Sequence, residues 1–412
     1  MQSRPFYGYV LAGYSFVVCF LAASFFLHAR GVFFPYWMGE FGVSKTELAA
    51  AVTATLLTGA LFAPVMGYMI DRFRLKVIVI CASGWLTTGY LLMQWVDSYW
   101  ALLIVLIPFQ GLGWTGIGPL VHTKLMVNWF RRNRGMALGI AIMGMSVAGI
   151  IMPPINAYLA ETIGWRDVYL VYVALLLFLV IPGTLWLLKQ HPSEIGQFPD
   201  GDMKPPEETA PVVDGGVQVY REVLTNSAFW SVVLTFGLMN GVYSAMATHL
   251  PTYMSTELDY SIQDAAWLLS IAGGFAISGK IVFGWMMDRL PAKLTVMSGV
   301  IAYIGSTLAI MSGAGMTELV IAAALFGLGF GGMVPVRSVV ISRLFGAAKF
   351  SRANGLLSFF IAPATFWVLI TGYVADQAGS YIPAFQIWCG AFTLAGVVSL
   401  IVRIPNADEA VQ

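Results

Sequence analysis

Four basic side chains lie inside apolar segments that are long enough to cross a membrane. They are Arg30, Lys124, Lys280 and Arg337. A charge near the centre of a bilayer costs roughly 3 kcal/mol or more, so such a residue is expected to face a protein interior or a water path. We find no acidic residue at comparable depth in the sequence. The expected counter-ion is therefore a small anion that arrives from outside.

Arg337 and Lys280 are the first candidates for an anion-binding site. The planar guanidinium of Arg337 can hold a carboxylate through two hydrogen bonds. Lys280 offers a point charge, or a desolvated amine that shares its proton. A structural alternative stays open for each residue: Lys280 could extend toward the headgroups, and Arg337 could bind main-chain carbonyl groups.

Two histidines are further candidates, both for substrate binding and for proton coupling. His28 lies toward the outer end of the first apolar segment, and His122 follows Gly118 by one helical turn in the fourth. The unperturbed pKa of a histidine lies close to neutral pH, which suits a proton switch. Lys280 is the third candidate for proton coupling. Arg30 and Lys124 are expected nearer the headgroups, which their long side chains can reach.

A polar stripe adds candidates in the seventh apolar segment. Asn240, Tyr243 and Ser244 follow the spacing i, i+3, i+4, so they share one face of a helix. Such a stripe would be costly against lipid. Asn240 and Tyr243 are therefore predicted to line a cavity, and hydrogen bonding between helices is the alternative.

The elements that carry these residues are predicted to be transmembrane helices. The chain has 412 residues, of which 58% are hydrophobic and only 10% are charged, whereas soluble domains carry about 25% charged residues. Apolar stretches of the length that spans a bilayer recur throughout. The pattern predicts an all-α membrane protein with twelve transmembrane helices, at residues 6–36, 45–69, 75–96, 99–127, 133–160, 166–189, 226–256, 261–287, 293–313, 317–344, 350–377 and 382–404.

The twelve helices are predicted to form two related halves. Residues 1–189 form the first six-helix bundle, residues 190–225 a polar, proline-rich linker that is expected to be flexible, and residues 226–412 the second bundle. The sequence from Gly67 to Arg72 recurs from Gly284 to Arg289. A Gly-Leu-Gly segment that ends in proline recurs at nearly the same offset. Repetition at one offset indicates a duplicated six-helix unit.

The distribution of basic residues predicts the orientation. Lys45 and Arg166 lie in loops on one side, and all other Lys and Arg residues outside the four buried positions lie on the opposite side. By the positive-inside rule, both termini and the linker are then cytoplasmic. We expect a multi-pass protein of the cytoplasmic (inner) membrane.

Two motifs give a resemblance to a known family. Residues 31–42 (GVFFPYWMGEFG) and residues 128–139 (NWFRRNRGMALG) resemble segments of the major facilitator superfamily, and within it of the monocarboxylate transporter and oxalate/formate antiporter group. The resemblance implies secondary transport of small carboxylates by alternating access, as proton symport or anion exchange. It aligns a cation of helix 8 with Lys280 and a helix 1 lysine with His28. Proton-coupled members carry an acid where this chain has Ala276, so coupling through that acid is not expected.

Charged residues at the turns after helices 2 and 8 are predicted to gate the transport path. Asp71, Arg72, Asp288 and Arg289 are expected to form a charge-relay latch between helices and not to touch substrate.

Other function classes have less support in the sequence. An efflux pump for drugs or other cationic solutes is the alternative, but it usually needs a carboxylate within the membrane. We find no paired catalytic carboxylates and no H-E-x-x-H motif, so an enzyme is not expected. We expect no cofactor, no metal site and no nucleic-acid partner, and we expect the three cysteines to be small buried residues. We expect the chain to be a monomer. Its expected partners are a small carboxylate, lipid and, where transport is proton-coupled, protons.

Overall fold

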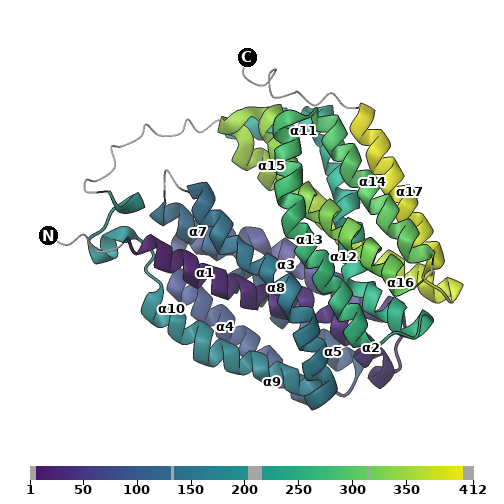
Figure 1. Cartoon of the computed structure of the whole chain (residues 1–412). Coiled ribbons are helices and arrows are strands. Elements are labelled where there is room, and N and C mark those ends of the chain that lie inside the picture. Colours follow the sequence, from purple (N-terminus) through teal and green to yellow (C-terminus); the bar gives the residue numbers. More distant parts are fainter. Residues whose placement is uncertain (1–5, 131–133, 203–215, 313–314, 402–412) are drawn as a thin grey trace. The chain divides into compact units, whose positions relative to one another are not determined.

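The described part of the chain is almost entirely helical. The computed structural model describes residues 6–130, 134–202, 216–312 and 315–401, and Figure 1 shows their helices. Twelve helices in these ranges are long and apolar enough to cross a membrane, which confirms the predicted fold class. The chain divides into two compact units, one of residues 1–43 and 54–210 and one of residues 44–53 and 211–412.

The first unit contains six of the predicted spans. Three of them are interrupted by short π-helical turns, Ser24–His28, Leu106–Gln110 and Leu176–Val180, which shift the side chains that follow to a new face. Its helices are α1 (Gly8–Ala23), α2 (Arg30–Phe41), most of α3 (Lys45–Arg72), α4 (Leu75–Leu92), α5 (Tyr99–Val105), α6 (Gly111–Ile117), α7 (Pro119–Trp129), α8 (Arg134–Ile163), α9 (Trp165–Leu175) and α10 (Ile181–Leu187).

The second unit contains the other six spans and the first turns of α3. The start of α13 is fixed by a capping box in which Ser261 and Asp264 bind each other's main-chain N–H groups. Its helices are α11 (Gly216–Thr225), α12 (Ser227–Glu257), α13 (Ile262–Arg289), α14 (Ala292–Met311), α15 (Met316–Ile361), α16 (Phe366–Ala378) and α17 (Ile382–Ile401).

The largest difference from the predicted boundaries is at the first span. It was expected to end at residue 36 but continues through Pro35 to Phe41. It ends at Gly42, whose φ of 61° lies in the left-handed region that glycine adopts without a steric penalty. The local signal for the end of this helix is therefore the glycine and not the proline.

The internal repeat is visible in the packing of each unit. In the first unit, a Cβ atom on Gly111 would lie 2.9 Å from the carbonyl oxygen of Thr55. At the corresponding place in the second unit, Gly327 packs against the carbonyl group of Ala272. Each unit therefore brings two helix backbones into contact through a glycine, as is common in membrane proteins.

The helix α15 contains two membrane spans. The spans are Met316–Gly346 and Arg352–Ala378, the second of which continues into α16. Between them the backbone turns at Gly346, where φ is 71° and ψ is 168°. This conformation is essentially restricted to glycine, so Gly346 determines where the first of these spans stops.

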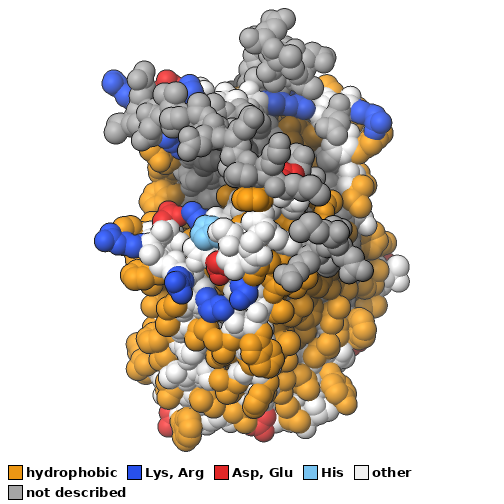
Figure 2. All heavy atoms as spheres, turned by 90° about the vertical axis from the view of Figure 1, so that its left-hand side faces the viewer, with side chains coloured by type: hydrophobic (Ala, Val, Ile, Leu, Met, Phe, Trp, Pro, Cys, Tyr) orange, Lys and Arg blue, Asp and Glu red, His pale blue; other side chains and the backbone are white. Residues whose placement is uncertain are grey.

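Large apolar side chains are exposed on the outside of the helices. The exposed fractions of Phe178 and Trp186 are 80% and 77%. Figure 2 shows hydrophobic side chains covering much of one face, next to a band where Lys, Arg and His side chains gather. Exposed apolar surface of this extent is expected of helices that lie in lipid.

Parts of the predicted linker are ordered against the units that they adjoin. The side chain of Gln190 accepts a hydrogen bond from the N–H of Leu75 at 3.0 Å, and the side chain of Gln197 accepts one from the N–H of Tyr7 at 3.1 Å. In the second unit, Lys349 forms an ion pair with Glu222 of α11. The rest of the predicted linker, residues 203–215, lies outside the described residues.

Candidate functional site

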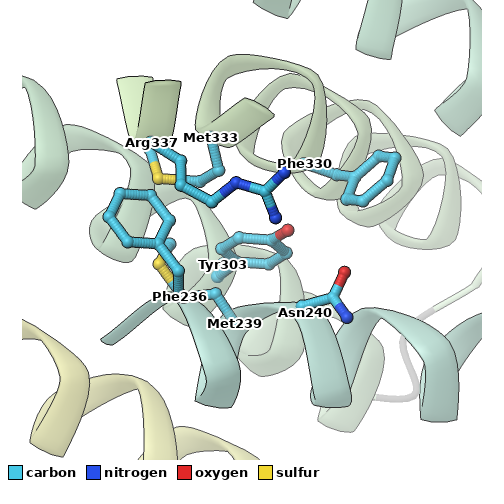
Figure 3. Close-up of a pocket in the computed structure, with 7 residues that line it drawn as sticks. All are labelled: Phe236, Met239, Asn240, Tyr303, Phe330, Met333 and Arg337. Atoms are coloured by element: carbon cyan, nitrogen blue, oxygen red, sulfur yellow. The ribbon is translucent and has the colours of Figure 1, made fainter. Parts of the chain in front are cut away.

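A pocket in the second unit contains two of the predicted site residues. It encloses about 310 Å³ of space that is not filled by protein atoms, including the part that opens to solvent. Helices α12, α14 and α15 supply its walls (Figure 3), which are lined by Phe236, Met239, Asn240, Tyr303, Phe330, Met333 and Arg337.

Arg337 supplies the positive charge of this pocket. It lies on α15, two residues after Pro335, and is partly buried. Its Nε atom is buried and has no hydrogen-bond partner within the described part of the chain. Figure 3 shows the guanidinium group directed toward the hydroxyl group of Tyr303, on the side of the pocket where Asn240 lies. An unsatisfied donor on a permanent cation is costly when buried, so the arrangement favours binding of an anion.

Aromatic rings form an ordered array behind the pocket. The ring of Phe330 stacks on Tyr243 of α12 with centroids 3.4 Å apart, and Tyr243 stacks on Phe326 at 5.5 Å. Tyr303 is fully buried and stacks on Phe392 of α17 at 4.7 Å. Tyr243 is thus placed beside a wall residue, while its neighbour Asn240 lines the pocket itself.

Lys280 lies on α13, which packs tightly against α15. Gly331 packs against the main chain of Ala276, and Gly279 packs against the carbonyl group of Leu328. Lys280 is partly buried and is not one of the residues that line the pocket. Ala276 is 8% exposed. The backbone of α15 therefore occupies the space beside Ala276.

His28 belongs to the first unit and ends a π-helical turn of the first span. Its ring lies against α8, where a Cβ atom on Gly149 would be 3.0 Å from it. Two residues later, the guanidinium group of Arg30 lies 5.8 Å from the ring centroid of Phe26, and this ring stacks on Trp114 at 4.7 Å. A cation over an aromatic face is stabilised by the ring electrons.

His122 is fully buried in the first unit. Its Nδ1 atom lies 3.0 Å from the hydroxyl oxygen of Ser15 on α1, and its Nε2 atom has no hydrogen-bond partner among the described residues. Both histidines belong to the first unit, and the residues that line the pocket belong to the second.

Lys124 has a partner that was not expected. Its Nζ atom lies 2.7 Å from Oδ1 of Asp71. The prediction that Lys124 lacks a carboxylate neighbour is therefore wrong, because α3 and α7 end close together and bring a terminal acid to the lysine. Arg72, the next predicted gate residue, donates to the hydroxyl group of Tyr68 at 2.7 Å.

The corresponding turn of the second unit has a different arrangement. The guanidinium group of Arg289 lies 5.0 Å from the ring centroid of Trp285. Arg343 of α15 donates to the carbonyl oxygen of Met287 at 2.8 Å. The side chain of Asp288 lies outside the described residues.

A charged cluster at the first turn of α3 was missed in the sequence. Asp376 accepts hydrogen bonds from the main-chain N–H groups of Lys45 and Thr46, at 3.2 and 2.7 Å, and so caps the helix. The Nζ atom of Lys45 lies 3.8 Å from Glu257 and 4.4 Å from the ring centroid of Tyr381. Burial, followed by the nearby carboxylates of Asp376 and Glu257, raises the pKa of Tyr381 well above its ordinary value.

The apolar pocket residues were also missed. Phe236, Tyr303 and Phe330 occur among many aromatic residues in apolar segments, where hydrophobic periodicity does not separate a cavity wall from a core position. The one available signal was spacing: Met333 and Phe330 precede Arg337 by four and seven residues, which places them on its face of α15.

Known proteins resemble the chain over most of its length. The sequence profile described as Major Facilitator Superfamily matches residues 14–317 and 254–410. Monocarboxylate transporter 13 of Rattus norvegicus is 24% identical over 92% of this chain and 85% of its own length. The glycerol-3-phosphate transporter of Bacillus subtilis is 24% identical over 86% of this chain and 84% of its own length.

A further relative and a solved structure agree with these matches. A probable L-galactonate transporter of Escherichia coli is 23% identical over 90% of this chain and 84% of its own length. The crystal structure of a bacterial homologue of the human lysosomal transporter Spinster covers 97% of this chain and 96% of its own, with a TM-score of 0.70 at 16% identity. This likeness extends the similarity from sequence to fold.

Proposed function

The chain belongs to the Major Facilitator Superfamily, and from this premise we propose that it moves a small, monocarboxylate-like organic anion by alternating access. Secondary transport follows from the family, and the chain is not an enzyme. The relatives are named for monocarboxylates, glycerol 3-phosphate and galactonate, all of which are anions. These names support a negative charge on the proposed substrate. They do not indicate the structure of the rest of the molecule.

The observation that carries the proposal is the position of Arg337 in an apolar pocket. Its Nε atom is buried without a partner in the described part of the chain, and the pocket walls are mostly aromatic and thioether side chains. A carboxylate would supply the missing acceptors in a bidentate geometry. We assign Arg337 as the principal anchor and Asn240 as a hydrogen-bonding neighbour.

The helices on which the other predicted residues lie suggest a role for each of them. We propose Lys280 as a second cation, on a helix that the glycines of α15 hold close to the helix of Arg337. Tyr243 positions Phe330 through ring stacking. His28, His122 and Lys280 remain the proposed sites of proton coupling, if the anion moves by proton symport and not by exchange.

The proposed location is the cytoplasmic membrane, with both termini and the linker inside. Twelve spans support a multi-pass protein. The distribution of Lys and Arg residues over the loops supports the orientation.

Uptake by proteoliposomes tests the proposal. Purified protein is reconstituted, and uptake of labelled lactate, benzoate and galactonate is compared with that of a labelled lipophilic cation. We expect Arg337→Gln to reduce anion uptake at least about thirtyfold, because the carboxylate loses a buried charge partner. Arg337→Lys should retain part of the uptake, because the charge remains without the planar fork.

Arg221→Gln is the matched control, because Arg221 is an exposed arginine on α11 of the same unit. Its uptake should equal that of the unmodified protein. Unchanged uptake in Arg337→Gln, or uptake of the cation alone, would refute the proposed site.

A further inference from the structure

The walls of the pocket restrict the body of the substrate as well as its charge. We infer that the transported anion carries a single negative charge on a flat, apolar body, as an aryl carboxylate does. This inference rests on the proposed function, in which Arg337 anchors the anion. It separates the substrate of this chain from the polyhydroxylated acid and the phosphate ester for which two of the relatives are named.

The charge of the pocket matches a monoanion. Among the residues that line it, Arg337 is the one cation and Asn240 is the one amide. A phosphate monoester carries about −1.5 to −2 charges at neutral pH. The second charge would meet no further cation among the residues that line the pocket, because Lys280 lies outside this lining, and an uncompensated charge is strongly unfavourable in surroundings of low dielectric constant. A carboxylate brings one charge and two acceptor oxygens, which one guanidinium satisfies.

The walls match an apolar body. Five of the seven lining residues have aromatic or thioether side chains, namely Phe236, Met239, Tyr303, Phe330 and Met333. Each hydroxyl group of a sugar acid would need a hydrogen-bond partner to replace water. Beyond the groups that bind the carboxylate, the walls offer little more than the Asn240 amide and the Tyr303 hydroxyl group. A sugar acid would therefore leave several hydroxyl groups unpaired, while an apolar body leaves none.

The rings favour a flat body over a merely apolar one. Phe330 is held by a parallel stack on Tyr243, with an interplanar angle of 6°. Tyr303 is held in the same way by Phe392, with an angle of 14°, and meets Phe326 edge to face at 5.2 Å. Both rings that line the pocket are thus held by stacking partners on neighbouring helices. Fixed planar walls bind a planar ligand with little loss of conformational entropy, and offset or edge-to-face ring contacts add to the binding.

Calorimetric titration of the full-length protein in detergent micelles tests the inference. The probes are benzoate, galactonate, glycerol 3-phosphate and benzyl alcohol, which has the ring without the charge. We expect benzoate to bind at least about tenfold more tightly than each of the others, a difference of roughly 1.4 kcal/mol.

Variants then separate the ring contacts from the charge contact. Phe330→Leu keeps an apolar side chain and removes the ring, so it should weaken benzoate binding about three- to tenfold and leave galactonate binding unchanged. Phe178→Leu is the matched control, because Phe178 is 80% exposed in the first unit. Phe236→Leu provides a second ring variant in case Phe330→Leu does not fold.

The outcomes distinguish this inference from the function on which it rests. If galactonate or glycerol 3-phosphate binds as tightly as benzoate, and Arg337→Gln abolishes that binding, the inference of a flat, apolar substrate is wrong. The proposed anion site at Arg337 is then retained. If no anion binds, or if Arg337→Gln leaves benzoate binding unchanged, both are wrong. Equal binding of benzyl alcohol and benzoate would also refute both.

Discussion

The ion pair of Lys124 and Asp71 joins the ends of two helices of the first unit. The side chains are 38% and 69% exposed, so solvent screens the pair and its contribution to stability is about 1 kcal/mol or less. A contact this weak can form and break within a transport cycle. Because it lies at a turn that is predicted to act as a gate, we expect it to be a switchable contact and not a structural anchor.

A double-mutant cycle on this pair tests the gate at the level of single residues. We expect Asp71→Asn and Lys124→Gln each to lower the transport rate severalfold while the melting temperature falls by less than about 2 °C. The double variant should be no worse than either single variant, because both remove the same interaction. Rates that multiply in the double variant would show that the two residues act independently.

The ion pair also shows what the sequence could not supply at this scale. The two residues are 53 positions apart, and a lysine in an apolar helix gives no indication of a partner on another helix. Arg337 and Asn240 were predicted, because an isolated polar group in an apolar segment needs an explanation. Phe236 and Tyr303 are apolar or aromatic residues in apolar segments and gave no such signal. Their place in the pocket wall is visible only in the packing.

At the scale of elements, the contact between α13 and α15 holds one wall of the pocket. Gly327 and Gly331 place the backbone of α15 directly on that of α13. No side chain separates the two helices at these positions. Arg337 and Phe330 therefore stand on a helix whose position is set by backbone contact, and a side chain added at this contact must displace α15.

Substitution of one glycine tests this wall. Gly331→Ala places a methyl group against the main chain of Ala276, and overpacking of this kind typically costs about 1–3 kcal/mol. We expect a lower melting temperature and weaker benzoate binding. Gly355→Ala on the same helix is the control, because its new methyl group would meet nothing within 4 Å, and alanine is the better helix former. Equal melting temperatures for the two variants would contradict a close backbone contact.

The helices themselves were predictable from the sequence, because a bilayer imposes a length on every span. The π-helical turn that ends at His28 was not, since it depends on packing against other helices and not on a residue signal. The start of α3 was predicted, but the hydrogen bond from the N–H of Thr46 to Asp376 was not, because the two residues are 330 positions apart.

At the scale of the whole molecule, the coupling of transport depends on which groups can exchange a proton. The residues that line the described pocket include neither a carboxylate nor a histidine, and the guanidinium of Arg337 holds its proton throughout the physiological range. Ala276, where the family resemblance implied an acid in proton-coupled members, is buried against Gly331. We therefore expect the binding step itself to need no proton.

Counterflow in proteoliposomes tests this prediction. We expect vesicles that contain unlabelled benzoate to take up labelled benzoate with no pH gradient, at a rate at least about tenfold above that of empty vesicles, because an anion that binds without a proton can be exchanged for another anion. Vesicles without protein provide the background rate. Uptake that requires an inward proton gradient even with benzoate inside would contradict the prediction, and would assign the proton to His28, His122 or Lys280.

The turn at Gly346 has a consequence for how the chain enters the membrane. The spans on either side of it end at Gly346 and begin at Arg352, so only residues 347–351 connect them. A connection this short cannot reach across a bilayer, and Arg343, Lys349 and Arg352 place positive charge around it. The two spans therefore enter the membrane in opposite directions, and their adjacent ends stay on the same side of it.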